Sequence, residues 1–238
     1  MNIAIIGYGK MGKMIESIAV ERGHHIILKI DIDNQDDFTQ ANLEKAQVAI
    51  EFSKPETAFA NVSRCIEYGV PVVSGSTGWH NRLDEVKRLC TECNGSMLCT
   101  SNFSLGVNIF FEINRNLARM MNRFPDYAVN IEEIHHTQKL DAPSGTAITL
   151  AEDVISEISR IEKWELVETR RATSLPIHAI RRDSVPGTHC VTYSSEIDDI
   201  EITHTAHSRK GFALGAVIAA EYIHDKKGIF TMKDVLMI

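Results

Sequence analysis

The segment 132–147 concentrates side chains that can hold and transfer protons. Its titratable members of interest are His135, His136 and Lys139. They come just before Pro-Ser-Gly-Thr, which predicts a loop that turns into the start of a helix. Gly145 and Thr146 would then offer backbone N–H groups and a hydroxyl as an anion site. A carboxylate bound there would lie near the histidines and the lysine, which suits a negatively charged substrate that must gain a proton.

A reductase has a use for this combination. Hydride addition to a conjugated C=N or C=C system leaves electron density that must be protonated, and general acid catalysis typically accelerates such a step about 10²–10⁴-fold. Histidine titrates near neutral pH, which suits it to this task. The residues also allow a non-catalytic interpretation, in which the His-His pair is solvated surface or a strand end and Glu132 and Glu133 neutralise cations. No metal site is predicted, because no carboxylate or cysteine follows at ligand spacing.

A second motif points to a nucleotide. Residues 7–12 form a complete G-x-G-x-x-G, which reads Gly7-Tyr8-Gly9-Lys10-Met11-Gly12. An apolar strand precedes it, a helical apolar stripe follows, and a second strand over 25–30 ends at Asp31. This order predicts a dinucleotide-binding βαβ unit. The glycines allow a tight turn, close approach of a pyrophosphate and close helix packing, while the helix start favours the anion.

Asp31 bears on the choice of cofactor. A carboxylate at this position accepts hydrogen bonds from the ribose 2′-OH and repels a 2′-phosphate, and no arginine stands nearby in the sequence. We therefore predict NADH as the preferred cofactor, with NADPH as the alternative.

The elements around these motifs alternate. Strands are predicted over 48–52 and 70–74, with a helix over 55–69 between them. The residues after the second strand are Gly75, Ser76 and Thr77. Because an open α/β sheet places its ligand at the carboxyl ends of its strands, we expect a nicotinamide-side contact there.

After residue 100 the pattern changes. Helices are predicted over 107–121, 146–161 and 212–220, and antiparallel strands over 191–193 and 200–203. The expected fold class is α/β, with a Rossmann-type dinucleotide-binding domain and an α+β substrate-binding and oligomerisation domain that has a mixed sheet. The expected boundaries are 1–103, completed by 212–238, for the first domain and 104–211 for the second.

The composition limits the classes of protein to which the chain can belong. The 238 residues are 44% hydrophobic and 24% charged, with a formal charge of -7, so a globular protein is expected and a nucleic-acid partner gains no support. No apolar run approaches the roughly 20 residues that span a bilayer, and no signal peptide is evident, so we expect a cytoplasmic protein. Cys90 and Cys93 are expected to be reduced, on the inner face of a helix, with zinc or redox chemistry as the alternative.

The chain also resembles a known family. The stretch Glu133–Ala147 closely resembles the signature E-x-H-H-x-x-K-x-D-A-P-S-G-T-A of the 4-hydroxy-tetrahydrodipicolinate reductases, or dihydrodipicolinate reductases. The likeness extends over almost the whole chain, and its other segments are 75–78, 101–108, 177–181, 187–189 and 208–213.

This resemblance implies an activity and a set of roles. The activity is NAD(P)H-dependent reduction of 4-hydroxy-tetrahydrodipicolinate, via dihydrodipicolinate, to tetrahydrodipicolinate in diaminopimelate and lysine biosynthesis, by a homotetramer built through the second domain. His135 would be the general acid/base and Lys139 the proton donor. The substrate dicarboxylate would be held by His136, Ser144, Gly145 and Thr146. The cofactor contacts would be residues 7–12, Asp31, Gly75, Ser76, Thr77, Thr100, Ser101, Asn102 and Phe103.

The chain departs from the family pattern at three places. Its glycine loop is one residue shorter, Asp183 stands where a glycine is common, and the segment between Asp31 and Val48 is compressed. Two other functions remain open: a related amino-acid dehydrogenase acting on aspartate or diaminopimelate, and a non-catalytic NADH-sensing regulator. The first has no evident need for the His-His-x-x-Lys and Ser-Gly-Thr combination, and the second would need a DNA- or partner-binding module that the sequence does not suggest.

Overall fold

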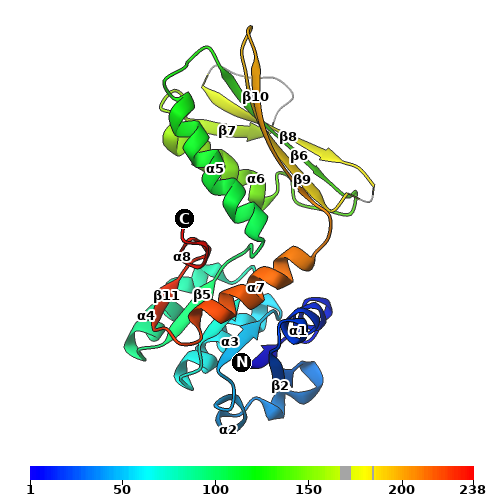
Figure 1. Ribbon diagram of the computed structural model, residues 1–238, viewed down its shortest axis with the longest axis vertical. Helices are drawn as coiled ribbons and strands as arrows, with labels where there is room; N and C mark the ends of the chain where they lie inside the picture. Colours follow the sequence, from blue (N-terminus) through cyan, green and yellow to red (C-terminus); the bar gives the residue numbers. More distant parts are fainter. Residues whose placement is uncertain (167–172, 184) are drawn as a thin grey trace. The chain divides into compact units, whose positions relative to one another are not determined.

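The computed structural model describes residues 1–166, 173–183 and 185–238. They form two compact units (Figure 1). One comprises Met1–Leu105 and Lys210–Ile238, and the other comprises Gly106–Arg209. The chain therefore leaves the first unit once and returns to it.

The first unit is built on a six-stranded sheet in the order β11-β5-β4-β3-β1-β2, in which all paired strands are parallel. Its strands are β1 (Asn2–Ile6), β2 (His25–Ile30), β3 (Val48–Glu51), β4 (Val72–Ser74), β5 (Ser96–Cys99) and β11 (Gly228–Phe230). Chain order reverses between β1 and β3, since β2 lies on one side of β1 and β3 on the other. Ligands of open α/β sheets bind in the crevice at such a switch point.

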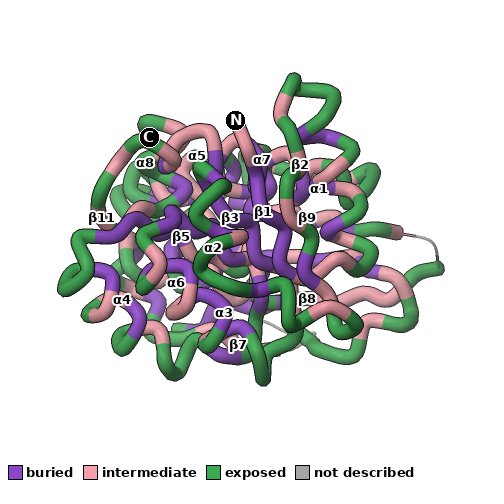
Figure 2. The backbone as a smooth tube through the Cα atoms, turned by 90° about the horizontal axis from the view of Figure 1, so that it is seen from below, coloured by how far each residue is buried: buried purple, intermediate pink, exposed green. Residues whose placement is uncertain are grey.

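Helices cover both faces of this sheet. They are α1 (Lys10–Glu21), α2 (Gln40–Leu43), α3 (Pro55–Glu67), α4 (Leu83–Glu92), α7 (Lys210–Ile223) and α8 (Met232–Leu236), with 3₁₀ turns at Ile32–Asp37 and His80–Arg82. One core joins α1 and α7 to the sheet, and a second joins α3 and α4 to its other face. The inner strands of the sheet are buried from both sides, as the purple tube of β1 and β3 in Figure 2 shows, which explains why they read as continuous apolar runs.

The second unit carries a five-stranded mixed sheet in the order β10-β9-β6-β8-β7. Its strands are β6 (Ala128–His135), β7 (Lys163–Leu166), β8 (Ser174–Arg181), β9 (Gly187–Ser194) and β10 (Asp199–Ala206), and its helices are α5 (Leu105–Met121) and α6 (Gly145–Glu157). β6 pairs in parallel with β8 and antiparallel with β9. Both helices pack on one face, where alternate residues of β6 and β9 are buried. The other face presents half-exposed side chains.

The expected fold class is confirmed, including the mixed second sheet. The helix expected over 146–161 is too long, because α6 ends at Glu157 and Ile158 adopts an extended conformation. Cys90 lies on the inner face of α4 as expected, but Cys93 is exposed, because it follows the last helical residue. Both thiols are free. Among the described residues, no helix has the length and apolar character that crossing a membrane requires.

Candidate active site

The glycine turn between β1 and α1 has the geometry its sequence predicts. Gly7 has a φ of 90°, and a Cβ there would lie 2.2 Å from the carbonyl oxygen of Phe52. A Cβ at Gly12 would lie 2.3 Å from the oxygen of Gly7, whereas one at Gly9 would meet nothing within 4 Å. The first and third glycines are therefore needed for packing. The open space at Gly9 leaves room for a phosphate to approach the backbone.

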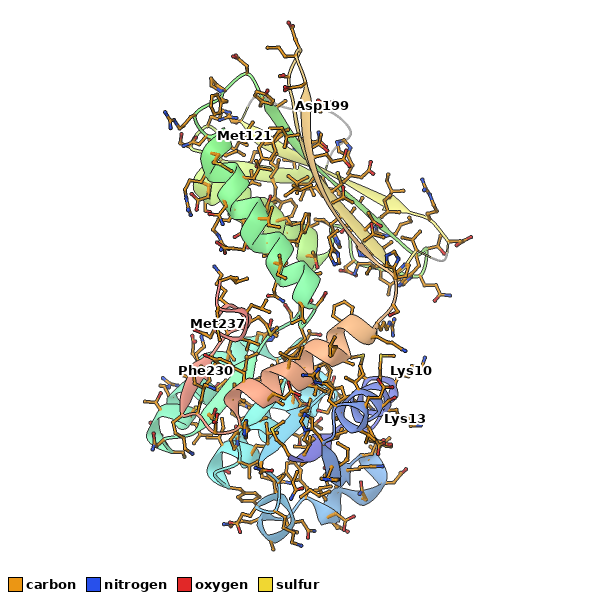
Figure 3. All side chains as sticks on the ribbon, viewed as in Figure 1. Lys10, Lys13, Met121, Asp199, Phe230 and Met237 are labelled. Carbon is orange, nitrogen blue, oxygen red and sulfur yellow. The ribbon has the colours of Figure 1, made fainter. Side chains whose placement is uncertain are left out.

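The start of α1 offers positive charge to an anion. The N-cap residue is Gly9, which has no side chain to accept hydrogen bonds from the first N–H groups of the helix. Lys10 and Lys13 are exposed on the first turns and are labelled on α1 in Figure 3. Free N–H groups and nearby lysines suit the pyrophosphate of a dinucleotide.

Asp31 lies directly after β2, where the motif predicts it. Its backbone N–H donates to Asn34 Oδ1 at 2.7 Å, and its own Oδ1 accepts from the backbone nitrogen of Ile32 at 3.0 Å. The residue thus caps the 3₁₀ turn that fills the short connection to β3. The nearest lysine in sequence, Lys29, is bound by Glu16 at 2.7 Å.

The loops after β4 and β5 meet the β3 loop at the same edge of the sheet. The backbone nitrogen of Gly75 donates to the oxygen of Glu51 at 2.9 Å, and that of Thr100 donates to the oxygen of Ser74 at 3.1 Å. Two of the expected contact residues turn their side chains inward. Ser76 bonds to the Glu51 carboxylate, and Phe103 is 2% exposed in the core. Neither side chain is placed to meet a ligand.

In the second unit, the buried carboxylate of Glu133 joins four elements. Its oxygens lie 3.1 and 3.0 Å from the backbone nitrogen of Ser144, at the start of α6. Arg181, the last residue of β8, donates to it at 3.3 Å, and His189 Nε2 on β9 lies 3.7 Å away. Burial raises the pKa of Glu133, but hydrogen bonds from His189 and Ser144 outweigh it and lower the pKa to about 2. The group is therefore ionised at neutral pH.

His135 lies two residues beyond Glu133 on the same face of β6. Its Nδ1 is 3.6 Å from Glu133 Oε2, and its ring stands edge-on to that of His189. A Cβ at Gly187, where φ is 157°, would lie 3.1 Å from His135 Nε2, so the glycine makes room for the imidazole. Burial lowers the pKa of His135 to about 4, although Glu133 acts in the opposite direction. His135 is therefore a neutral imidazole near pH 7.

The Ser-Gly-Thr turn starts α6, as predicted. Ser144 is the N-cap, and its hydroxyl accepts from the backbone nitrogen of Ala147 at 3.2 Å and contacts His189 Nε2 at 3.1 Å. Ser144 is buried, whereas Gly145 is exposed and Thr146 half-buried. The cap thus uses the hydroxyl of Ser144 and leaves the N–H groups of Gly145 and Thr146 facing an accessible region.

The loop 136–143 holds Lys139 beside this helix start. Lys139 Nζ binds both oxygens of Asp141, at 2.8 and 2.9 Å, and Asp141 is largely exposed. Arg181 donates to the backbone oxygens of Lys139 and Asp141 at 3.4 and 2.6 Å, so it fixes the loop. Asp183, the departure from the family pattern, accepts a hydrogen bond from Thr137 at 2.7 Å and adds a further tie. The half-buried ring of His136 follows the end of β6.

Glu133, His135 and His189 bring atoms of metal-ligand type within 4.8 Å of one another. Sequence spacing could not show this set, because antiparallel pairing places His189 directly opposite Glu133. However, Glu133 already accepts from Ser144 and Arg181, and the guanidinium beside it opposes a second cation. The arrangement is better suited to a hydrogen-bonded network than to a metal centre.

Four site residues were missed from the sequence: Glu51, Glu133, Arg181 and His189. Glu51 ends an apolar strand and Glu133 faces inward on β6, and a buried polar side chain at such a position must have partners. Arg181 and His189 belong to segments that carry the family resemblance, and this was the signal that could have placed them in the site.

A Rossmann-type unit with a phosphate turn, joined to an α+β unit with a proton-handling cluster, defines a two-domain oxidoreductase that uses a nicotinamide dinucleotide. Comparisons with known proteins narrow this class. The N-terminal domain of dihydrodipicolinate reductase matches residues 1–103, and its C-terminal domain matches residues 106–236. The chain belongs to the dihydrodipicolinate reductase family.

Individual relatives agree. A 4-hydroxy-tetrahydrodipicolinate reductase of Christiangramia forsetii is 54% identical over 99% of this chain and 98% of its own length. One from Neisseria gonorrhoeae is 33% identical over 93% of this chain and 83% of its own. The solved structure of dipicolinate-bound dihydrodipicolinate reductase from Paenisporosarcina sp. TG-14 is similar in fold, with a TM-score of 0.78 at 20% identity over 97% of both chains.

Proposed function

We propose that this protein reduces 4-hydroxy-tetrahydrodipicolinate, via dihydrodipicolinate, to tetrahydrodipicolinate in the diaminopimelate and lysine pathway. The observation that carries the proposal is the network in the second unit. There, Glu133 fixes the start of α6, so that an anion-binding turn lies on the same short loop as Lys139 and next to the strand end that carries His135.

The first unit holds the cofactor. The turn 7–12 and the start of α1 take the pyrophosphate, Asp31 takes the adenosine ribose, and the loops 75–77 and 100–103 take the nicotinamide half. When bound, the reduced nicotinamide supplies the hydride. The open space at Gly9 and the exposed lysines of α1 support this assignment. Asp31 favours NADH, because its carboxylate can accept from a ribose 2′-OH but repels a 2′-phosphate.

The second unit binds the dicarboxylate and handles the proton. The backbone N–H groups of Gly145 and Thr146 bind one carboxylate, with His136 and the buried cap Ser144 supporting the turn. Lys139 is the proton source: its half-buried ammonium lies on the loop before the anion-binding turn, where the exposed Asp141 binds it with both oxygens. His135 is neutral before substrate binds, and a dianionic substrate beside it would raise its pKa. Binding of the substrate therefore favours protonation of the His135 imidazole.

The uncovered face of the second sheet supports assembly. Alternate side chains of β6 and β9 on this face, among them Glu132, Cys190 and Thr192, are half-buried, although neither of the helices described in this unit, α5 and α6, packs on this face. A hollow of about 460 Å³ next to β6 and β8 is lined in part by Glu132, His178 and Ile180. We propose that copies of the chain associate through this face to form a homotetramer, in which each copy makes isologous contacts with more than one neighbour.

The test is a steady-state assay with freshly made hydroxytetrahydrodipicolinate and each cofactor in turn. We expect substrate-dependent NADH oxidation that exceeds NADPH oxidation. Lys139→Ala should lower kcat about 10²–10⁴-fold while the Kd for NADH is unchanged. Activity with an oxo-acid and ammonia, but none with the cyclic substrate, would favour the amino-acid dehydrogenase. Cofactor binding without any turnover would favour the NADH sensor.

A further inference from the structure

The most densely hydrogen-bonded carboxylate of the first unit has no part in the roles assigned so far. Glu51 is the last residue of β3 and is 0% exposed. Its Oε1 accepts from the backbone nitrogen of Ser53 at 2.9 Å, from Ser53 Oγ at 2.5 Å and from Ser76 Oγ at 2.8 Å. Its Oε2 accepts from Ser74 Oγ at 2.5 Å. One side chain thus gathers four donors from two neighbouring loops.

These donors belong to the segments that leave adjacent strands at the switch-point edge. Ser74 is the register partner of Glu51 and ends β4, while Ser53 and Ser76 lie two residues beyond the ends of β3 and β4. The loops are also bonded directly, because the backbone nitrogen of Ser53 donates to Ser76 Oγ at 2.8 Å. The carboxylate therefore acts as a common anchor for both loops.

The anchor extends to the other expected cofactor segments. The ring of Phe52 lies so close to Gly75 that a Cβ there would be 2.2 Å from it, and the carbonyl of Phe52 packs equally closely on Gly7 of the glycine turn. Phe52 also packs against Phe103, with ring centroids 5.7 Å apart and the rings tilted by 47°. Since Phe52 stands between Glu51 and Ser53, moving the anchored loop would disturb the glycine turn and the loop at Phe103 together.

We propose that Glu51 is a positioning residue for the cofactor: it holds the loops after β3 and β4 in the conformation that binds the nicotinamide half of the dinucleotide. This inference rests on the proposed function of the first unit. A preorganised loop binds its ligand without first losing conformational freedom, so loosening the anchor weakens cofactor binding. A buried carboxylate with four donors is also hard to replace, because its removal leaves hydroxyls without acceptors.

The chain offers a matched pair of variants for the test. Ser74→Ala removes one donor to Glu51, whereas Ser96→Ala removes an equally buried serine of the adjacent strand β5 that instead donates to the backbone oxygen of Ile223. Both should lower the melting temperature of the full-length protein. Only Ser74→Ala should weaken NADH binding, measured by cofactor fluorescence at a temperature where each variant is folded.

Glu51→Gln and Glu51→Asp complete the series. We expect Glu51→Gln to raise the Kd for NADH about tenfold, since the amide leaves only one acceptor oxygen for the four donors, with Glu51→Asp lying between it and the wild type. The Kd for dipicolinate, a ligand of the second unit under our proposal, should stay unchanged in all four variants. Normal NADH affinity in Glu51→Gln and Ser74→Ala would overturn the positioning role, as would equal weakening by Ser96→Ala. A wild type that binds NADH but does not reduce hydroxytetrahydrodipicolinate would contradict the proposed reaction alone, and the Glu51 assignment would stand.

Discussion

Both carboxylate oxygens of Glu133 lie within 3.1 Å of the backbone nitrogen of Ser144, so a charged group inside the sheet holds the first residue of the anion-binding turn. The relationship links strand β6, which carries His135, to the N-terminus of α6. Glu133 is fully buried and ionised, so it can hold the loop in one place. The backbone N–H groups at the start of α6 therefore point in a fixed direction, although the loop before them is largely exposed.

Glu133→Gln should separate this anchoring from general structure. The amide keeps the shape of the side chain but loses the charge that Arg181 and Ser144 bind, so we expect a loss of about 1–3 kcal/mol in the free energy of unfolding. Dipicolinate should bind about tenfold more weakly by calorimetry. The control is Glu196→Gln, an exposed carboxyl in the turn between β9 and β10 of the same unit. Equal effects of the two changes would refute a specific role for Glu133.

The buried imidazole of His135 predicts a pH dependence of stability. Its pKa is lowered from 6.5 to about 4, so between these values the unfolded chain binds a proton that the folded chain does not. Its contribution to stability is therefore full above pH 6.5 and is lost as the pH falls toward 4. Denaturant unfolding can be measured at pH 7 and pH 5, on either side of the ordinary histidine pKa of about 6.5. The free energy of unfolding should fall less between these two pH values for His135→Asn than for the wild type. An identical fall in both would contradict the assigned protonation state.

Asp31 should control the choice between the two nicotinamide cofactors. Asp31→Asn keeps an N-cap side chain for the 3₁₀ turn but removes the charge that opposes a 2′-phosphate. We expect the ratio of kcat/KM for NADPH to that for NADH to rise about tenfold or more, because like-charge contacts are strongly unfavourable. Asp33→Asn, an exposed neighbour, is the control. If neither change alters the ratio, another group sets the preference.

A charge placed on the uncovered face of the second sheet should prevent assembly. Thr192 lies in β9 on this face, so Thr192→Arg is expected to give particles smaller than the wild type in light scattering, since an unpaired buried charge is unfavourable at an interface. Ser156→Arg, on the exposed side of α6, should leave the particle size unchanged. A monomeric wild type would contradict the proposed tetramer directly.

Much of this architecture follows from local sequence. The βαβ order around residues 1–31 is dictated by β-branched apolar runs and by glycines that the packing at Phe52 requires. The start of α6 follows from a serine cap before Gly145. Strands β5, β6, β7, β8 and β11 were not individually predicted. β11 is only three residues long, and it pairs with β5 after the chain has returned from the second unit. The local pattern of apolar residues cannot predict such a long-range pairing.

The site was predictable where its residues are neighbours in sequence, as in the loop that carries Lys139 and Gly145. It was not predictable where strand pairing creates the contact. His189 reaches Glu133 because the two are opposite each other in an antiparallel ladder, and Arg181 reaches the same carboxylate from the parallel neighbour β8. Burial among these residues changes the chemistry of the sequence motif, because it lowers the pKa of His135 and makes it a neutral group instead of one that titrates near pH 7.

The central claim is that a nicotinamide held by the first unit gives its hydride to a dipicolinate-type ring held by the second. The most direct measurement uses NADH deuterated on the transferring side of nicotinamide C4, with freshly made hydroxytetrahydrodipicolinate, and follows the product by mass spectrometry. We predict tetrahydrodipicolinate that carries one deuterium, formed in step with NADH oxidation and greatly slowed by Lys139→Ala. NADH that remains unoxidised with active substrate, or a product without label, would contradict the account.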